Sequence, residues 1–259
     1  ADRDFYYGDP YTNPKTPIRG LLSDSYAKER ASTIDHQQNN PDVFPGDPYP
    51  YEGTQNPYAA LLQERKAKFA PHMDLNKDFV PKHDAGIAPS SSMESKASLS
   101  ASLAVDSLYE DRLLRGTTSV EAADEEGWVV SITPSGGWLP ACIAGKTGVG
   151  MSQRLQSFVL DSLINPFNVV SPGKRPRVTL TPSMALKDGR PYLSFAVQGG
   201  DTQDQNLLQF FLNMVEFGMT PQQATEAPNI NSNQLWLSLG GTKSDDRKPR
   251  SGSLLLDKR

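Results

Sequence analysis

The sequence has few of the residues that disulfides, metal sites and histidine-based catalysis require. It has one cysteine, Cys142, among 259 residues, which excludes an internal disulfide and any multi-cysteine metal centre. Cys142 stands in the apolar run WLPACIAG, so we expect a buried structural thiol rather than a nucleophile. The histidines, His36, His72 and His83, all precede residue 117 and show no metal-binding spacing. We therefore expect no metal and no cofactor.

Long apolar runs and an excess of positive charge are also missing. No apolar run reaches the length of a transmembrane helix, so we expect no membrane span. The 26 Lys and Arg residues are outnumbered by 30 Asp and Glu, and the net charge of -4 argues against a nucleic-acid partner. The sequence shows no initiator methionine and no signal peptide. We expect a processed product or an excerpt of a longer protein, and the residues leave its location unknown.

Turn-forming residues are abundant in the first half, with 20 Gly and 21 Pro in the whole chain. Helices are predicted at 21–35, with Ser23 as a cap, and at 56–70, with Asn56 as a cap. A Ser- and Ala-rich connector follows them. We divide the chain into three parts. Residues 1–85 form a turn-rich first part, 86–116 a connector with a processing segment, and 117–259 the second part.

The second part has a different pattern, in which strands come first and helices follow. Hairpins are predicted at 118–133 and 177–197, and a helix at 203–218 with an apolar face. A short helix is expected to begin at Pro221. Because strands and helices do not alternate regularly, the pattern favours an α+β or layered sandwich fold.

Thr117 is the residue whose surroundings suggest chemistry. It follows Gly116 directly after the pliable connector, where a cut would make it a new N-terminus. The α-amine of such a threonine has an ordinary pKa of about 7.7–8.0 and can accept the hydroxyl proton without a histidine. Gly199-Gly200, before the predicted helix, would offer backbone amides to an oxyanion, although a plain turn is the alternative.

The glycine-rich stretch AGKTGVG, 144–150, resembles part of a phosphate-binding loop. Such a loop needs a glycine where Pro140 stands, and no strand-to-helix context surrounds it. We therefore exclude a nucleotide site and interpret the stretch as a loop over an active site.

Three stretches together resemble the small subunit of the gamma-glutamyltransferase family of N-terminal-nucleophile (Ntn) hydrolases: GTTSVEAADEEGWVVSIT, SPGKRPRVTLTPSMALKDGRPYLSFAVQGG and LLQFFLNMVEFGMTPQQATEAPNIN. The opening ADRDFYYGDP and RGLLSDSYAKERASTID resemble the end of that family's large subunit. The resemblance implies a four-layer αββα sandwich, only part of it in this chain. It also implies cleavage between Gly116 and Thr117, and hydrolysis or transfer of an amide-linked acyl group.

The resemblance also assigns roles to individual residues. Thr117 matches the nucleophile, and Ser135 matches a residue that contacts the nucleophile's amine. Gly199 and Gly200 match the oxyanion glycines, and Thr179 matches one of two serines that hold a substrate carboxylate. As partners, the resemblance implies a small-molecule amide substrate and the remaining large-subunit segment or a companion chain. It leaves a homo-oligomer open and implies a periplasmic or secreted location.

One stretch departs from the family. The family's acidic residue that grips the substrate α-amine falls in QRLQSF, where Gln156 and Ser157 replace aspartates and Arg154 adds a cation. A protonated α-amine would lose its charge-assisted partner there. We therefore predict an amidohydrolase of altered acyl-group specificity, with Arg154, Ser157 and Thr179 as substrate contacts. For Arg154 the alternative is a surface arginine, or one that supports the site without touching the substrate. For the protein the alternatives are a true gamma-glutamyltransferase with a rearranged glutamate pocket and a catalytically silent scaffold.

Overall fold

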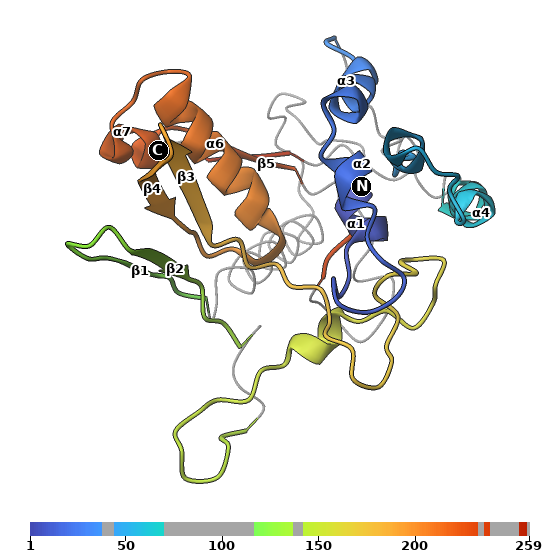
Figure 1. Cartoon of the computed structure of the whole chain (residues 1–259), viewed down its shortest axis with the longest axis horizontal. Coiled ribbons are helices and arrows are strands. Elements are labelled where there is room, and N and C mark those ends of the chain that lie inside the picture. Colours follow the sequence, from blue (N-terminus) through green and yellow to red (C-terminus); the bar gives the residue numbers. More distant parts are fainter. Residues whose placement is uncertain (38–43, 70–116, 137–141, 233–235, 239–253, 258–259) are drawn as a thin grey trace, which may run out of the picture. The chain divides into compact units, whose positions relative to one another are not determined.

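The computed structural model describes residues 1–37, 44–69, 117–136, 142–232, 236–238 and 254–257. The chain forms two compact units, each assembled from separate stretches of sequence. The first unit contains the described parts of 1–75, 154–179 and 225–259, and the second contains those of 76–153 and 180–224. Figure 1 shows helices and sheets in the described part, as expected for an α+β chain. Each described sheet has two strands.

The first unit is built around aromatic rings from distant stretches of the chain. Phe5, Tyr6 and Phe167 are fully buried, and partly buried Tyr and Leu side chains pack against them. The rings of Tyr6 and Phe167 lie 5.6 Å apart, in the range of a favourable aromatic pair. The elements of this unit are α1 (Asp2–Tyr6), α2 (Ile18–Leu21), α3 (Asp24–Ser32), η1 (Tyr49–Glu52), α4 (Ala59–Phe69), η3 (Arg154–Ser157), β5 (Asn229–Ser232) and β6 (Leu254–Asp257).

The helix predicted at 21–35 is two helices with a break between them. α2 ends at Leu21 and α3 begins at Asp24. Ser23 is the N-cap of α3, and its Oγ accepts a hydrogen bond of 3.2 Å from the Tyr26 N–H. The cap explains the break, because an N-cap residue has non-helical backbone angles and cannot continue the preceding helix. The second predicted helix is α4, which follows a turn where Asn56 Oδ1 accepts from the Tyr58 N–H.

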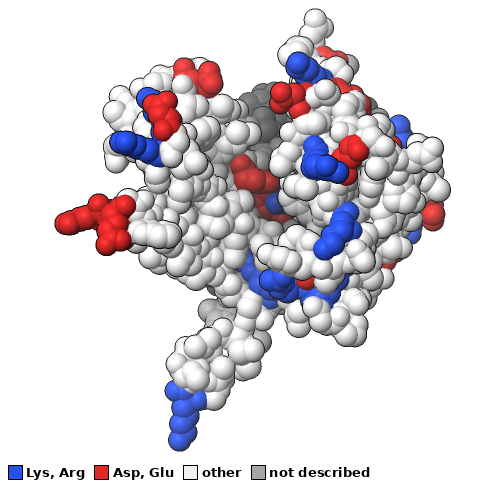
Figure 2. Space-filling model, in the orientation of Figure 1, with Lys and Arg blue, Asp and Glu red and all other residues white. Residues whose placement is uncertain are grey.

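The second unit contains two hairpins, and the second begins at Ser183, later than the predicted start at residue 177, because residues 177–179 belong to the first unit and 177–182 form no strand. β1 (Val120–Ala123) pairs antiparallel with β2 (Val129–Ile132), and its acidic turn projects from the hairpin (Figure 2). β3 (Ser183–Lys187) pairs antiparallel with β4 (Arg190–Phe195), with a register shift between Ala185 and Leu186.

Helix α6 (Gln203–Val215) follows β4 through the short helix η4 (Gly200–Thr202), and α7 (Pro221–Glu226) comes after it. The ring of Phe195 at the end of β4 stacks on Phe211 of α6, with centroids 5.7 Å apart. The apolar face predicted for this helix is only partly covered by described residues, since Leu207 is buried and Leu208 is 58% exposed.

Cys142 is a correction to the sequence prediction. The structure places it on the surface as a free thiol, where we expected a buried one. It precedes an exposed loop closed by the bridge between Ile143 and Gly150. The described residues of this loop are mostly exposed, so the apolar neighbours of Cys142 in the sequence do not indicate that it is buried.

Candidate active site

The hairpin β1–β2 holds Thr117 and Ser135 against each other. The two residues form an antiparallel bridge just outside the strands, and Thr118 N–H donates to Pro134 O over 3.2 Å. The hydroxyl of Thr117 donates to Ser135 Oγ over 3.0 Å. Both residues are half-buried. The hairpin thus continues its register past β1 and β2 to fix the two hydroxyls side by side.

Gly199 and Gly200 lie in the same unit, in the turn between β4 and α6. Their φ angles of +130° and +55° are ones that residues with a Cβ rarely adopt. A Cβ at Gly199 would also lie 2.8 Å from Thr202 Oγ1. The Thr202 side chain locks the turn, because its hydroxyl donates to Gly199 O over 2.9 Å and its N–H donates to the same oxygen. The backbone here is therefore shaped in a way that needs glycine.

Arg154 and Thr179 meet in the first unit. Arg154 is 8% exposed, Thr179 is 2% exposed, and the guanidinium Nη1 donates to Thr179 Oγ1 over 2.9 Å. The sequence singled out these two residues for different reasons, one as a departure from the family and one as a match. Their hydrogen bond brings a cation next to the hydroxyl for which a substrate carboxylate is expected.

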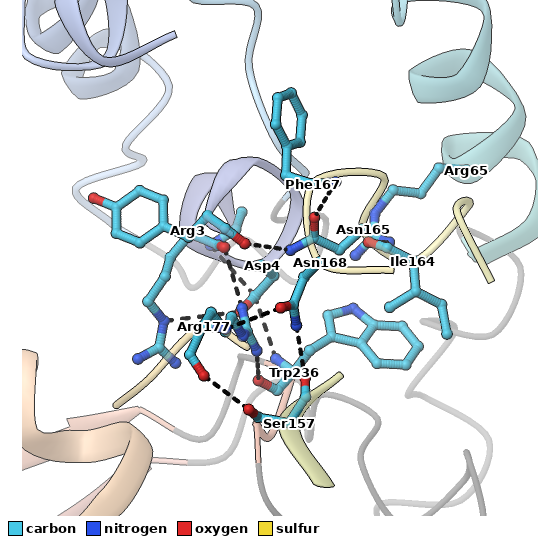
Figure 3. Close-up of polar contacts among 12 residues, drawn as sticks. Arg3, Asp4, Arg65, Ser157, Ile164, Asn165, Phe167, Asn168, Arg177 and Trp236 are labelled. Carbon is cyan, nitrogen blue, oxygen red and sulfur yellow. Dashed lines mark hydrogen bonds and ion pairs between the residues drawn. The ribbon is translucent and has the colours of Figure 1, made fainter. Parts of the chain in front are cut away.

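Ser157 is in the same unit, but its hydroxyl hydrogen-bonds to backbone carbonyl oxygens. Ser157 is 2% exposed, and its Oγ lies 2.7 Å from both Arg177 O and Arg154 O, so its one proton is shared between two backbone oxygens. Figure 3 shows the contact with Arg177. Asn168 Nδ2 donates to Ser157 O over 2.6 Å. These bonds fix the η3 turn that carries Arg154. A substrate contact by Ser157 stays a prediction.

Sequence reasoning missed the buried polar network that supports this turn (Figure 3). Arg177 Nη1 donates to Arg3 O over 3.1 Å and lies 3.5 Å from Asp4 Oδ1, while Asn168 Oδ1 accepts from the Arg177 N–H. Asp4 Oδ2 accepts from Trp236 N. Arg177 stands two residues before Thr179, the predicted carboxylate contact, and that position was the signal that could have pointed to it.

The PGKRP stretch, residues 172–176, has a structural explanation as well. Asp9 accepts hydrogen bonds from the backbone N–H of Arg175 over 2.9 Å and of Tyr11 over 3.0 Å. These bonds, together with the nearby Arg175 guanidinium, hold the pKa of the Asp9 carboxyl below the ordinary 3.8. The Arg175 guanidinium also lies over the Tyr11 ring, 4.5 Å from its centroid.

The described contacts therefore form two groups, each within its own unit. Thr117 and Ser135 share the second unit with Gly199 and Gly200, and Arg154, Ser157 and Thr179 share the first. Gly116 lies outside the described residues. In the described ranges, His, Cys, Asp and Glu side chains nowhere gather in threes that could hold a metal ion. Every helix in the part of the chain that the structure describes is too short or too polar to span a membrane.

Comparisons with known proteins agree on one family. The family model described as gamma-glutamyltranspeptidase matches residues 60–253. The glutathione hydrolase proenzyme of Bacillus subtilis (strain 168) is 29% identical over 239 residues, which cover 91% of this chain and 32% of the relative. The acylase ACY 1 proenzyme of Pseudomonas sp. (strain V22) is 30% identical over 136 residues, covering 52% of this chain and 23% of that protein.

A solved structure, described as "Structure of LmbA2991T421A", has a similar fold. The two superpose with a TM-score of 0.61 at 28% sequence identity, and the match covers 98% of this chain and 36% of the other chain. The chain spans about a third of the length of the curated glutathione hydrolases that it matches.

Proposed function

Because the chain belongs to the gamma-glutamyltranspeptidase family of Ntn hydrolases, we propose that it carries the nucleophile of a self-processing amidohydrolase or acyltransferase. Thr117 is the nucleophile, and the acyl group that it takes differs from glutamyl. The 3.0 Å hydrogen bond between Thr117 and Ser135 carries this proposal, because it places a second hydroxyl beside the attacking oxygen. The complete protein is proposed to be a four-layer αββα sandwich to which this chain contributes a part.

Self-processing would begin at the bond before Thr117. The Thr117 hydroxyl oxygen adds to the carbonyl carbon of Gly116, and the carbon–nitrogen bond breaks as the nitrogen gains the hydroxyl proton. The product is an ester between Gly116 and Thr117 Oγ1. Water then hydrolyses this ester, which leaves a Gly116 carboxylate, a free Thr117 hydroxyl and a free α-amine.

Turnover would reuse the same atoms. The α-amine accepts the hydroxyl proton while Oγ1 attacks the substrate carbonyl, and the amides of Gly199 and Gly200 stabilise the oxyanion. The intermediate collapses to an acyl-threonine ester as the leaving amine takes the proton from the α-ammonium. Water, or an acceptor amine in transfer, then attacks the ester with the α-amine as base, and Thr117 regains its proton.

The acyl specificity would follow from the pair Arg154 and Thr179. The cation opposes a protonated α-amine and favours a carboxylate. A γ-glutamyl group without its α-amine is a glutaryl group, which keeps the terminal carboxylate and the chain length. We therefore propose a glutaryl-like acyl group as the substrate class, with Arg154 and Thr179 as contacts to its carboxylate.

The test compares two chromogenic amides, glutaryl-p-nitroanilide and γ-glutamyl-p-nitroanilide, on the full-length polypeptide that carries this sequence. We expect kcat/KM to be about 10-fold or more higher for the glutaryl compound, the size of one charge-assisted contact. Mass spectrometry should detect an acyl-threonine on Thr117. The control variant Thr117→Ala should remain one chain and turn over neither compound.

The other outcomes separate the alternative functions. Preference for the γ-glutamyl compound, at a rate comparable to that of a relative with the aspartate, would contradict altered specificity and favour a rearranged glutamate pocket. An uncleaved wild type that hydrolyses and traps nothing would favour a silent scaffold.

A further inference from the structure

Gln203 is a buried polar side chain that the proposed mechanism does not use. It is the first residue of α6, directly after η4, and its exposed fraction is 0%. Its Oε1 accepts from the Thr181 N–H over 3.2 Å and from the Thr181 hydroxyl over 3.3 Å. Its Nε2 is buried and has no hydrogen-bond partner among the described residues.

The identity of this side chain therefore needs an explanation. A buried amide donor without an acceptor lowers stability, and an apolar side chain of similar size, such as Met, would avoid that loss. What Met could not supply is the acceptor oxygen that holds Thr181. We take that oxygen, rather than the amide nitrogen, as the part of Gln203 that the site needs.

Gln203 joins two segments of the second unit, the residues that lead into β3 and the glycine turn before α6. Gly200 is three residues before it, and Thr202 locks Gly199 from the other side of the turn. Thr181 lies two residues before the first residue of β3, Ser183. A single side chain thus ties the start of α6, directly after the glycine turn, to the segment that leads into β3.

We infer that Gln203 is a positioning residue, whose side-chain oxygen holds Thr181 to the first turn of α6 and thereby fixes where the Gly199 and Gly200 amides point. This inference rests on the proposed acyl-transfer function. Amides that stabilise an oxyanion act in the transition state, so a displaced turn lowers kcat and leaves KM nearly unchanged.

The variants Gln203→Met and Gln203→Glu test the inference on the full-length polypeptide with glutaryl-p-nitroanilide. Gln203→Met removes the acceptor, and we expect kcat to fall about 10-fold or more with KM within about twofold. Gln203→Glu keeps an acceptor oxygen at the N-terminus of α6, where a carboxylate is favoured, and should recover most of kcat. The matched control Gln209→Met, on the same helix, should behave as wild type.

Thr181→Val keeps the inference testable if Gln203→Met does not fold, because it removes one donor of the same contact from the other side. We expect kcat to fall about two- to fivefold without a change in KM. Wild-type kcat in Gln203→Met or in Thr181→Val overturns the inference, and so does an equal loss in Gln203→Glu and Gln203→Met. If the wild type itself releases no p-nitroaniline from either amide and stays uncleaved, the proposed function fails and the inference with it.

Discussion

Thr117 Oγ1 donates to an oxygen, Ser135 Oγ, that can in turn pass a proton on or hold an amine. Because the Thr117 hydroxyl proton points to Ser135 Oγ, a lone pair on Thr117 Oγ1 is left to attack a carbonyl. Ser135 therefore orients the Thr117 hydroxyl but is not needed to generate the nucleophile. The proposed base stays the Thr117 α-amine, and Ser135 orients the group that the amine activates.

We predict that Ser135→Ala slows acyl-threonine formation by about 5- to 10-fold, the size of one hydrogen bond of about 1 kcal/mol. Ser135→Thr keeps the hydroxyl and should retain most of the rate. The measurement is the burst of p-nitroaniline in a single turnover. Ser131→Ala, which removes a hydroxyl bonded to Glu121 on the same exposed hairpin, is the matched control and should leave the burst unchanged. An unaltered burst in Ser135→Ala would show that this contact is irrelevant to chemistry.

At the scale of elements, local signals predicted the architecture of the second unit well. The turns at 124–127 and 187–189 separate strands rich in β-branched and apolar residues, and both hairpins form. Ser23 was correctly predicted as an N-cap. The break between α2 and α3 was not predicted, although it follows from the cap, because an N-cap residue cannot continue a preceding helix. Cys142 misled the prediction, since the hydropathy of its neighbours does not reveal whether a loop packs against the unit.

The candidate site could be predicted only in part. Residue types and spacing predicted Thr117 as the nucleophile, which stays a prediction, and singled out the glycine pair, whose backbone angles need glycine. The network of Arg177, Asn168 and Asp4 depends on pairings between distant residues, such as Asp4 and Arg177 at a sequence separation of 173. Pairings over such separations leave no periodic signal in a single sequence.

The glycine turn before α6 gives a prediction at the same scale. Gly199→Ala should destabilise the protein by about 1–3 kcal/mol, because it places a Cβ at φ +130° and in collision with Thr202 Oγ1. Gly189→Ala is the matched control, since its φ of +74° is also positive but its Cβ would meet nothing within 4 Å. Denaturant unfolding of both variants measures the difference. Equal losses would mean that the close approach at Gly199 has no energetic weight.

At the scale of the molecule, the first unit is assembled from both sides of the proposed cleavage site. Asn165 Nδ2 donates to Tyr7 O, and Arg177 contacts Arg3 O and the buried carboxylate of Asp4. The aromatic core also joins residues from before and after the proposed cleavage site, since Phe5 and Tyr6 precede it and Phe167 follows it. The connection through residue 117 is therefore not what holds these segments together.

We accordingly predict that the cleaved protein stays associated. Denaturing mass spectrometry should show two chains, while size-exclusion chromatography in native buffer should show one species that contains both. Arg177→Met breaks a buried charged contact and should let the cleaved chains separate at a lower urea concentration than in the wild type. The uncleaved variant Thr117→Ala is the control for unfolding without separation. Two separate peaks for the wild type in native buffer would contradict the prediction.

The carboxylate of Asp9 ties the N-terminal stretch to the PGKRP stretch, and it makes this association depend on pH. Its pKa lies below the ordinary 3.8 in the folded protein, so the folded state binds fewer protons than the unfolded state as the pH falls toward and below that value. The stabilising contribution of Asp9 is therefore complete above the unfolded pKa and is lost as the pH falls through the folded pKa. We predict that Asp9→Asn lowers the urea midpoint at pH 7, and that the gap between wild type and variant narrows as the pH is lowered below about 4. A gap that stays constant down to pH 2 would show that Asp9 acts by shape and not by charge.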